Sequence, residues 1–306
     1  MQQVLFDEKM DGITIDRIRR EDGFSMPSKH LHDAYEIYYL LDGKRYYFIE
    51  KQTYEVTGGC LVFINRRQAH QTSQAGGGSH DRILIGLQEE PFSSFFCSTG
   101  ELKLEDFFEK HWGVLRLAPE ERPFVEGLLM QLADELHEKA AGYRLAAQAA
   151  LARLILFAAR RMTGAAVPAA PVSLSTTARH RKVNEVAGYI VNHYREPLSL
   201  ETVADRFFVS KCYLSRIFKE VTGFTVNEYI HLNRIREAQR LLSCTSLNIT
   251  EVSEALGYDT ITYFERVFKK FSGTTPLKYR LAYRGRMSPV RPEKYEGQSP
   301  SPFPLS

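Results

Sequence analysis

The stretch ITEVSEALGYDTITYFERVFKKFSGTTPLKY, residues 249–279, predicts a helix, a tight turn and a second helix. In the first helix Ile249, Val252 and Leu256 recur with the spacing of one helical face. Gly257 ends this helix, because only glycine enters the left-handed backbone region without steric cost. The second helix combines an aromatic inner face with a basic outer face, which suits the major groove of DNA. Its inner face consists of Phe264, Val267, Phe268 and Phe271.

The same pattern occurs a second time, about fifty residues earlier in the chain. The positions that match Phe264, Arg266 and Tyr279 are Leu214, Arg216 and Tyr229. The preceding helix repeats with an offset of 49 rather than 50, so the second turn has one extra residue. Two copies are too few for a solenoid, and they indicate a tandem pair of helix-turn-helix units in one domain.

Three stretches carry a family resemblance, namely SLETVADRFFVSKCYLSRIFKEVTG, NEYIHLNRIREAQRLL and ITEVSEALGYDTITYFERVFKKFSGTTPLKYR. In order and spacing they resemble the DNA-binding domain of the AraC/XylS family of transcription regulators, over roughly residues 180–284. Residues 180–286 contain 17 Lys and Arg against 11 Asp and Glu, whereas the whole chain has a net charge of only +3. This excess of positive charge is what a phosphate backbone attracts.

The length of 306 residues allows two domains, and we expect an α+β protein. Residues 1–162 are expected to form a cupin-like barrel with flanking helices that binds an effector and dimerises. Residues 163–179, which are small and proline-bearing, are expected to be a linker. Residues 180–285 are expected to form the all-α tandem helix-turn-helix domain, and residues 286–306 a disordered tail.

The N-terminal part has strand signals at Tyr35–Leu41, Arg45–Ile49, Cys60–Ile64 and Ile83–Leu87. Turn signals at Asp42-Gly43 and Gly58-Gly59 separate them. Several short strands at this spacing favour a small antiparallel barrel. The segments HLHDAYEIYYLLDG and YEVTGGCLVFINRRQAH resemble the cupin-type sensor barrel of sugar-responsive AraC-like regulators.

Two interpretations of this barrel stay open. By resemblance to cupin enzymes, a divalent metal would be held by His30, His32, Glu36 and His70, whose donor atoms are adequate ligands. Alternatively these groups only line an effector site, as the departures Cys60 and Asn65 from the cupin pattern favour. The effector candidates are then His32, Glu36, Tyr38, Tyr47 and His70, with no cofactor. Polar and aromatic lining, together with the resemblance, implies a sugar or related metabolite.

Two apolar stripes mark helices between the barrel and the linker. One stripe consists of Phe124, Leu128, Leu132 and Leu136, and the other of Leu145, Ala149, Ala152 and Leu156. Both stripes would cover the barrel under one interpretation. Under the other, the stripe from Leu145 to Leu156 pairs with its copy in a homodimer, as the resemblance favours.

DNA contacts are expected from the outer faces of the two second helices, which begin after the N-caps Ser210 and Thr260. Arg216 would read guanine. Glu265 would either accept a hydrogen bond from cytosine or only orient Arg266. The lysines would contact phosphates. Two readers on one duplex face would lie about 34 Å apart. The set is Lys211, Cys212, Ser215, Arg216, Lys219, Ile261, Thr262, Glu265, Arg266, Lys269 and Lys270.

The sequence therefore predicts a ligand-responsive, sequence-specific DNA-binding regulator rather than an enzyme. Its partners would be promoter DNA, a small effector, a second copy of the chain and RNA polymerase, and the resemblance implies an activator. The alternatives are a metal-dependent cupin enzyme fused to a DNA-binding domain, and a barrel that only dimerises. The four widely spaced cysteines and the absence of a signal or membrane segment favour a cytoplasmic location.

Overall fold

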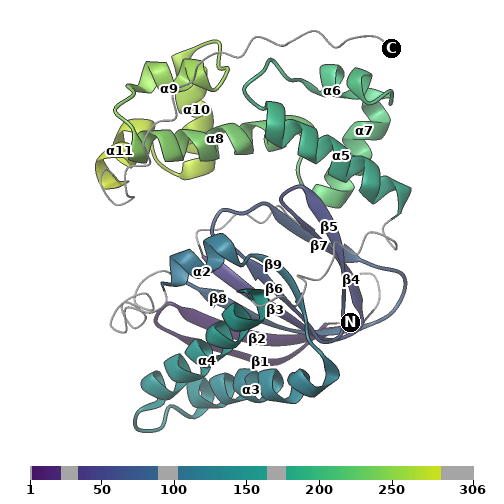
Figure 1. Ribbon diagram of the computed structural model, residues 1–306, viewed down its shortest axis with the longest axis vertical. Helices are drawn as coiled ribbons and strands as arrows, with labels where there is room; N and C mark the ends of the chain where they lie inside the picture. Colours follow the sequence, from purple (N-terminus) through teal and green to yellow (C-terminus); the bar gives the residue numbers. More distant parts are fainter. Residues whose placement is uncertain (1, 22–33, 89–102, 164–176, 284–306) are drawn as a thin grey trace. The chain divides into compact units, whose positions relative to one another are not determined.

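The computed structural model describes residues 2–21, 34–88, 103–163 and 177–283. The chain falls into two compact units, Met1–Tyr189 with Leu200–Val226, and Ile190–Ser199 with Asn227–Ser306. Strands occupy the N-terminal part and helices the C-terminal part (Figure 1), so the predicted two-domain α+β fold class is confirmed. The predicted tail and most of the predicted linker lie outside the described residues.

A six-stranded antiparallel sheet forms the larger layer of the N-terminal part. Its first two strands make a hairpin that turns at Gly12, whose φ of +72° suits glycine. The strand order is β1 (Gln2–Met10), β2 (Ile13–Arg20), β8 (His80–Leu87), β3 (Tyr35–Asp42), β6 (Cys60–Ile64) and β9 (Gly113–Arg116). The predicted strands at residues 35–41, 60–64 and 83–87 all lie in this sheet.

A second, three-stranded sheet contains β5 (Gln52–Thr57), β4 (Lys44–Ile49) and β7 (His70–Gln74) in that order. Side chains from both sheets share one buried cluster, which includes Tyr38, Val62 and Tyr47. Because successive side chains of a strand alternate between faces, Ile37 and Tyr39 point away from this cluster into another one. The central strands of the larger sheet, such as β3 and β6, are therefore buried on both faces.

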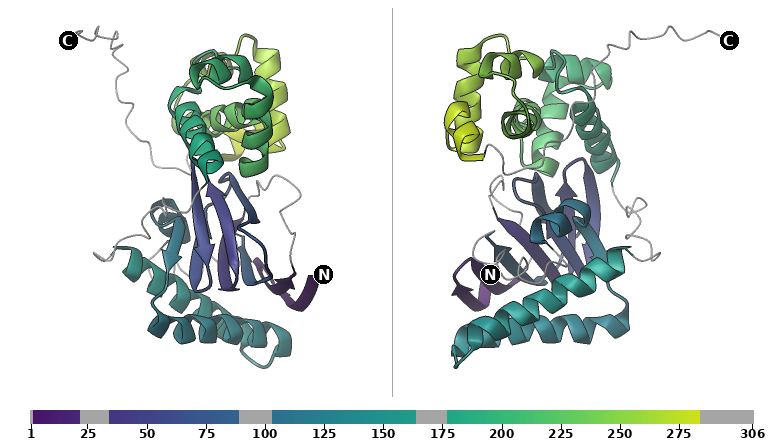
Figure 2. Two further views of the ribbon diagram at one scale, coloured as in Figure 1. Left: turned by 90° about the vertical axis from the view of Figure 1, so that its right-hand side faces the viewer. Right: turned by 60° about the vertical axis from the view of Figure 1, so that its left-hand side comes forward.

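The second face of the large sheet packs on helices (Figure 2). The helical elements here are α2 (Leu104–Lys110), the short η1 (Pro119–Glu121), α3 (Arg122–Glu138) and α4 (Tyr143–Thr163). The hydroxyl of Tyr39 donates to Oε1 of Glu126 at 2.6 Å and joins β3 to α3. Leu128, Leu132 and Leu136 are buried as predicted, whereas Phe124 is 41% exposed.

Of the two interpretations left open for α4, the one that placed the stripe from Leu145 to Leu156 on the barrel is wrong. Leu145 is 64% exposed and Leu156 is 40% exposed. The buried side of α4 instead contains Ala147, Ala150, Leu151, Leu154, Ile155 and Ala158. Small and apolar residues cover most of the circumference of this helix, so their spacing alone does not identify the buried side.

The first helix-turn-helix unit consists of α6 (Leu200–Arg206) and α7 (Lys211–Thr222), preceded by α5 (Ala178–His193). Ser210 caps α7 as predicted, since its hydroxyl accepts from the backbone N–H of Tyr213 at 3.3 Å. In the turn between α6 and α7, Phe208 has a φ of +54° and is 96% exposed. A bulky residue in this backbone region is strained, and the second unit has Gly257 at the matching position.

The second unit consists of α9 (Ile249–Ala255) and α10 (Ile261–Ser272), between α8 (Val226–Cys244) and α11 (Pro276–Tyr283). Asn248 and Glu251 form a capping box at the start of α9, with N–H···O distances of 2.9 and 2.6 Å. Thr260 caps α10, and Gly273 ends it with a φ of +72°. The predicted apolar residues Val252, Leu256, Phe264, Val267 and Phe268 form its core.

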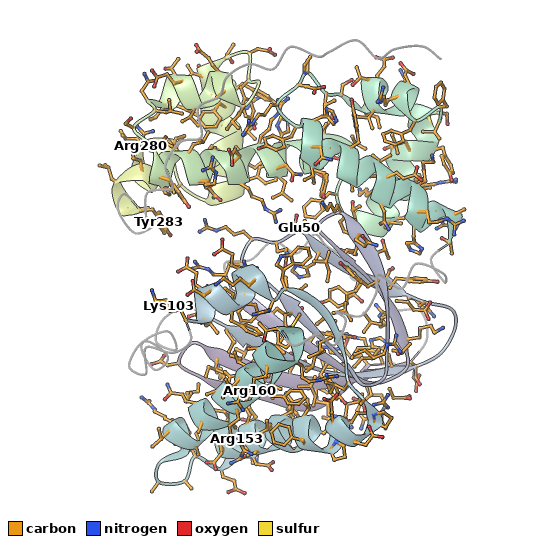
Figure 3. The ribbon with its side chains drawn as sticks, viewed as in Figure 1. Glu50, Lys103, Arg153, Arg160, Arg280 and Tyr283 are labelled. Carbon is orange, nitrogen blue, oxygen red and sulfur yellow. The ribbon has the colours of Figure 1, made fainter. Side chains whose placement is uncertain are left out.

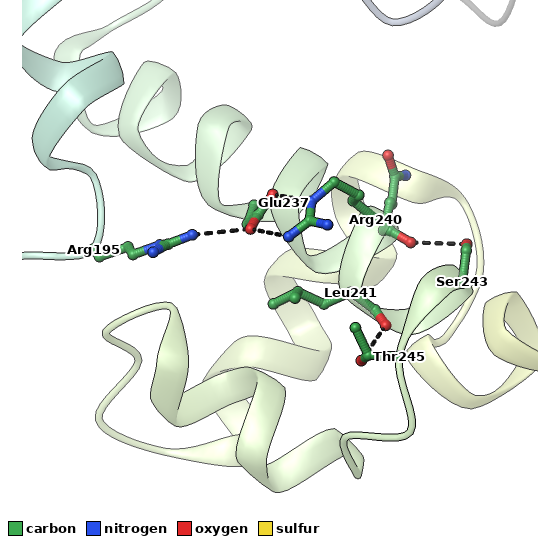
Figure 4. A network of polar contacts seen from close by, with 7 residues as sticks. Arg195, Glu237, Arg240, Leu241, Ser243 and Thr245 are labelled. Atoms are coloured by element: carbon green, nitrogen blue, oxygen red, sulfur yellow. Dashed lines mark hydrogen bonds and ion pairs between the residues drawn. The ribbon is translucent and has the colours of Figure 1, made fainter. Parts of the chain in front are cut away.

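Arg234 of α8 holds the turn of this second unit in place. Its guanidinium donates to the backbone carbonyls of Tyr194, Glu196 and Gly257 at 2.6, 2.7 and 2.9 Å. Gly257 must be glycine for a further reason: a Cβ atom there would lie 2.4 Å from the carbonyl oxygen of Arg195. Farther along α8, Glu237 accepts from Arg195 at 2.9 Å and from Arg240 at 2.8 Å (Figure 4).

Replacing Arg234 by methionine should destabilise α9 and α10 by about 3 kcal/mol, because three backbone carbonyls lose a charged donor in a buried site. Hydrogen exchange of the α9 and α10 amides in the full chain measures this loss. Arg240→Met is the control, since it removes a half-exposed charge from the same helix and should cost less than about 1 kcal/mol. Equal protection of these amides in the two variants would contradict the role of Arg234.

Candidate functional site

The outer face of α7 gathers the residues predicted to read DNA in the first unit. Lys211, Cys212, Arg216 and Lys219 are exposed, and Ser215 is half-buried. They line an open groove of about 610 Å³ together with Leu200 and Glu220. Lys211 also forms an exposed ion pair with Glu201 of α6 at 2.7 Å. The inner residues Leu214, Ile217 and Phe218 are buried, so the predicted division of this helix into two faces holds.

Arg216 is available for an external ligand. Within the described residues its guanidinium forms no ion pair or hydrogen bond. Glu220, which lies one helical turn after Arg216, binds Arg179 of α5 at 3.0 Å. An exposed guanidinium presents two parallel donors, which is the geometry that the guanine edge accepts.

On α10 the exposed side contains all of the residues predicted there. Ile261 is 39% exposed, and Thr262, Glu265, Arg266, Lys269 and Lys270 are also exposed. The guanidinium of Arg266 lies over the ring of Tyr263 at 5.0 Å from its centroid. The hydroxyl of Tyr263 is in turn 3.0 Å from Nε2 of His231. The structure thus orients Arg266 through Tyr263 rather than through Glu265.

Two partly exposed tyrosines at these faces were not predicted. Tyr213 and Tyr263 are 40% and 38% exposed. They occupy matching positions of the repeat, and this match could have identified them from the sequence. Arg280, on the short helix that follows α10, donates to the backbone carbonyl of Leu247. It therefore ties α11 to the loop before α9 (Figure 3).

The described effector candidates come together between the two sheets. The hydroxyl of Tyr47 donates to Oε1 of Glu36 at 2.8 Å, and Oε2 of Glu36 is 3.6 Å from Nε2 of His70. The rings of Tyr38 and Tyr47 meet edge to face at 5.3 Å. Burial raises the pKa of Tyr38 to about 12 and that of Tyr47 well above its usual value, so both remain neutral donors.

The proposed metal ligands are only partly within the described residues. His30 and His32 lie outside them, whereas Glu36 and His70 lie inside. In the described parts of the chain, no three His, Cys, Asp or Glu side chains are grouped to hold an ion. One oxygen of Glu36 already accepts from Tyr47. Glu36 and His70 therefore fit a hydrogen-bonding role at least as well as they fit coordination of a metal ion.

A second polar group inside the barrel was not predicted. It contains Arg45, Arg82 and His80, which are 1%, 7% and 4% exposed, and the half-buried Arg20 beside them. Burial, together with the nearby charges of Arg45, Arg20 and Arg82, lowers the pKa of His80 to about 4. The available signal was the period-two placement of Arg45 with Tyr47, and of His80 with Arg82.

Comparisons with known proteins match both parts of the chain. A family model described as a helix-turn-helix domain matches residues 203–282, and one described as an AraC-like ligand binding domain matches residues 13–155. The Msm operon regulatory protein of Streptococcus mutans is 26% identical over 263 residues, covering 82% of this chain and 85% of that protein.

Two further relatives extend this result. The HTH-type transcriptional activator RhaS of Salmonella arizonae is 23% identical over 257 residues, covering 82% of this chain and 87% of that protein. The xylose operon regulatory protein of Escherichia coli is 39% identical over 92 residues, covering 30% of this chain and 24% of that protein. The first two relatives match most of both chains, whereas the third shares a shorter segment.

The pKa of His80 generates a prediction about acid stability. Its pKa is about 4 in the folded chain and 6.5 ordinarily, so between these pH values only the unfolded chain binds the proton. The free energy of unfolding should therefore fall as the pH is lowered from about 6.5 to about 4. His80→Gln should weaken this slope, whereas His193→Gln, which changes a partly exposed side chain at the end of α5, should not. Urea unfolding followed by Trp112 fluorescence measures it, and identical slopes in all three proteins would refute the assignment.

Proposed function

Since this chain is an AraC-family helix-turn-helix transcription regulator with an N-terminal AraC-like ligand-binding domain, we propose that it is an activator of genes for a sugar or related metabolite. The family consists of regulators and not enzymes, which removes the fused cupin enzyme as an alternative. Across the described ranges no helix combines the length and apolar content that crossing a membrane requires. The part of the proposal that concerns DNA binding rests above all on the outward basic faces of α7 and α10.

We assign sequence reading to the exposed residues of these two helices. Arg216 lacks a partner in the described residues, and Arg266 is held over Tyr263, so both can reach a base edge. Glu265 forms no ion pair there either, which leaves its carboxylate available for cytosine N4. Lys269 and Lys270 follow on the same helix and suit phosphate contacts. The remaining proposed contacts are Lys211, Cys212, Ser215, Lys219, Ile261 and Thr262.

The effector would bind between the two sheets of the N-terminal part. Glu36, Tyr47 and His70 provide acceptors and donors within hydrogen-bonding reach of one another. The sugar class is supported by the relative named for a xylose operon, and activation by the relative named as an activator. An activator requires contact with RNA polymerase, which we include among the partners. We also propose the boundaries 1–162, 163–179, 180–285 and 286–306 for the domains, linker and tail.

The exposed stripe of α4 supports homodimerisation. Leu145 and Leu156 are apolar and exposed, and Phe124 of α3 is 41% exposed beside Arg153, whose guanidinium lies 5.5 Å from its ring centroid. Arg153 and Arg160 (Figure 3) border this stripe with positive charge. An apolar helix face with a charged border is the usual composition of a helix-to-helix interface between subunits.

The DNA-reading proposal predicts that Arg216→Ala and Arg266→Ala each weaken binding about tenfold, because one bidentate base contact contributes roughly 1–3 kcal/mol. Each should also relax the preference at one base position. Lys269→Ala should weaken binding to all sequences alike, and Lys278→Ala, on α11, is the control. Fluorescence anisotropy on a site selected from random DNA measures these effects. Unchanged affinity and base preference in both arginine variants would overturn the proposal.

The dimer proposal predicts that the double variant Leu145→Glu, Leu156→Glu sediments as a monomer, since two carboxylates would be buried in the interface. Leu277→Glu, which changes an exposed apolar residue of α11, is the matched control and should sediment as the wild type does. Analytical ultracentrifugation of the full chain distinguishes the two states. A dimer that persists in the double variant would place the interface elsewhere.

A further inference from the structure

Three side-chain rings join α8 to the start of α10 in the second unit. His231 lies on α8, Tyr258 in the turn before α10, and Tyr263 in the first turn of α10. The ring of His231 is stacked with that of Tyr258 at 5.8 Å between centroids, and it meets the ring of Tyr263 edge to face at 5.6 Å. Residues from three segments of the chain therefore pack around one imidazole.

This imidazole bonds to both phenols. Its Nδ1 is 3.3 Å from the hydroxyl of Tyr258, and its Nε2 is 3.0 Å from the hydroxyl of Tyr263. A neutral imidazole has one donor nitrogen and one acceptor nitrogen, so it can satisfy a phenol on each side in either tautomer. Tyr258 is 6% exposed and packs on the ring of Phe264 in the core. The half-buried His231 thus connects the exposed Tyr263 to a fixed, buried ring.

The surroundings of His231 favour its neutral form. Burial and the nearby charges of Arg234 and Lys270 lower the pKa of His231 below its usual value. The hydroxyls of Tyr258 and Tyr263 also face the ring, and burial raises the pKa of Tyr258. At neutral pH this side chain is therefore a hydrogen-bonding bridge and not a further positive charge.

The outer end of the bridge carries an arginine that faces outward. The guanidinium of Arg266 lies 5.0 Å from the centroid of the Tyr263 ring. The two residues are three apart on α10, so their side chains lie on the same helical face. An exposed arginine has many rotamers, and contact with the face of an aromatic ring favours one of them. The orientation of the Tyr263 ring therefore determines where this guanidinium lies.

The first unit has the same two residues without the bridge. Tyr213 and Arg216 occupy the matching positions of the repeat on α7. Among the residues that the structure describes, the Tyr213 hydroxyl has no hydrogen bond and the Arg216 guanidinium lies over no aromatic ring. The chain thus contains one arginine that is held in position and one that is not.

We infer that His231 is a positioning residue for base recognition, which fixes the ring of Tyr263 and thereby holds Arg266 where it reads a base. This inference rests on the proposed reading role of Arg266, and it adds a residue of α8 to those that determine specificity. Ordering a long side chain on binding lowers affinity, so holding Arg266 in advance should raise the preference for its base roughly two- to tenfold.

Binding of the full chain to single-base variants of its selected site tests this inference. The base whose preference Arg266→Ala relaxes is the test position, and the one that Arg216→Ala relaxes is the reference position. By fluorescence anisotropy, His231→Leu should reduce the preference at the test position roughly two- to tenfold and leave the reference position unchanged. His231→Gln should retain most of the preference, because its amide again offers one donor and one acceptor.

A double-mutant cycle separates positioning from a general effect on folding. Tyr263→Phe keeps the ring but removes the hydroxyl, so it should cause the same loss as His231→Leu. Adding His231→Leu to Tyr263→Phe should cause no further loss, because both changes break one hydrogen bond. Tyr213→Phe is the matched control in the first unit and should leave the preferences at both positions as they are.

Two sets of results would overturn the inference. One is an unchanged preference at the test position in both His231→Leu and Tyr263→Phe. The other is an equal loss at the test and reference positions, or losses that add in the double variant. An Arg266→Ala variant that keeps every base preference would instead overturn the proposed reading role, and this inference with it. Tyr263→Phe changes a partly exposed hydroxyl only, so it keeps the test decisive if His231→Leu does not fold.

Discussion

The buried guanidinium of Arg234 is the interaction on which the second DNA-reading unit depends. It binds three backbone carbonyls from two loops that are distant in sequence, and its charge lies 5.2 Å from the centroid of the Tyr258 ring. Burial lowers the pKa of this guanidinium group. Its positive charge strengthens the hydrogen bonds to the three carbonyl oxygens. The turn before α10 is thereby held at a fixed position, and with it the start of the helix that presents Arg266.

The two helix-turn-helix units differ in the residue that adopts a positive φ in the turn between their helices. In the second unit the turn contains Gly257, which fits both the positive φ and the close approach of the Arg195 carbonyl. In the first unit Phe208 adopts a positive φ with its ring almost fully exposed. Strain of this kind persists only where the surrounding structure determines the backbone. Both turns nevertheless place a hydroxyl N-cap, Ser210 or Thr260, at the start of the outward-facing helix.

The barrel uses the two faces of its larger sheet for different purposes. The outer face packs on α3 and α4 through aliphatic and aromatic residues such as Ile83 and Ile85, and it also contains the ion pairs of Asp81 with Arg17 and Arg19. The inner face of the same strands contains Arg82 and His80. A one-residue shift of register would exchange these faces, so the position of the polar group depends on correct strand pairing. The inner face can therefore hold charged groups without disturbing the packing of the helices.

Local sequence alone determined the helix-turn-helix repeat, its caps and its two-faced helices, because helical spacing, capping and glycine conformation act over a few residues. It also indicated the strands that contain Tyr38 and Tyr47. Tertiary structure decided which side of α4 is buried, since that helix is apolar on most sides. It likewise decided that Arg45 and Arg82 lie near one hydroxyl, that of Tyr38, and that Arg234 binds three carbonyls, because strand pairing and chain folding bring together residues that no local pattern connects.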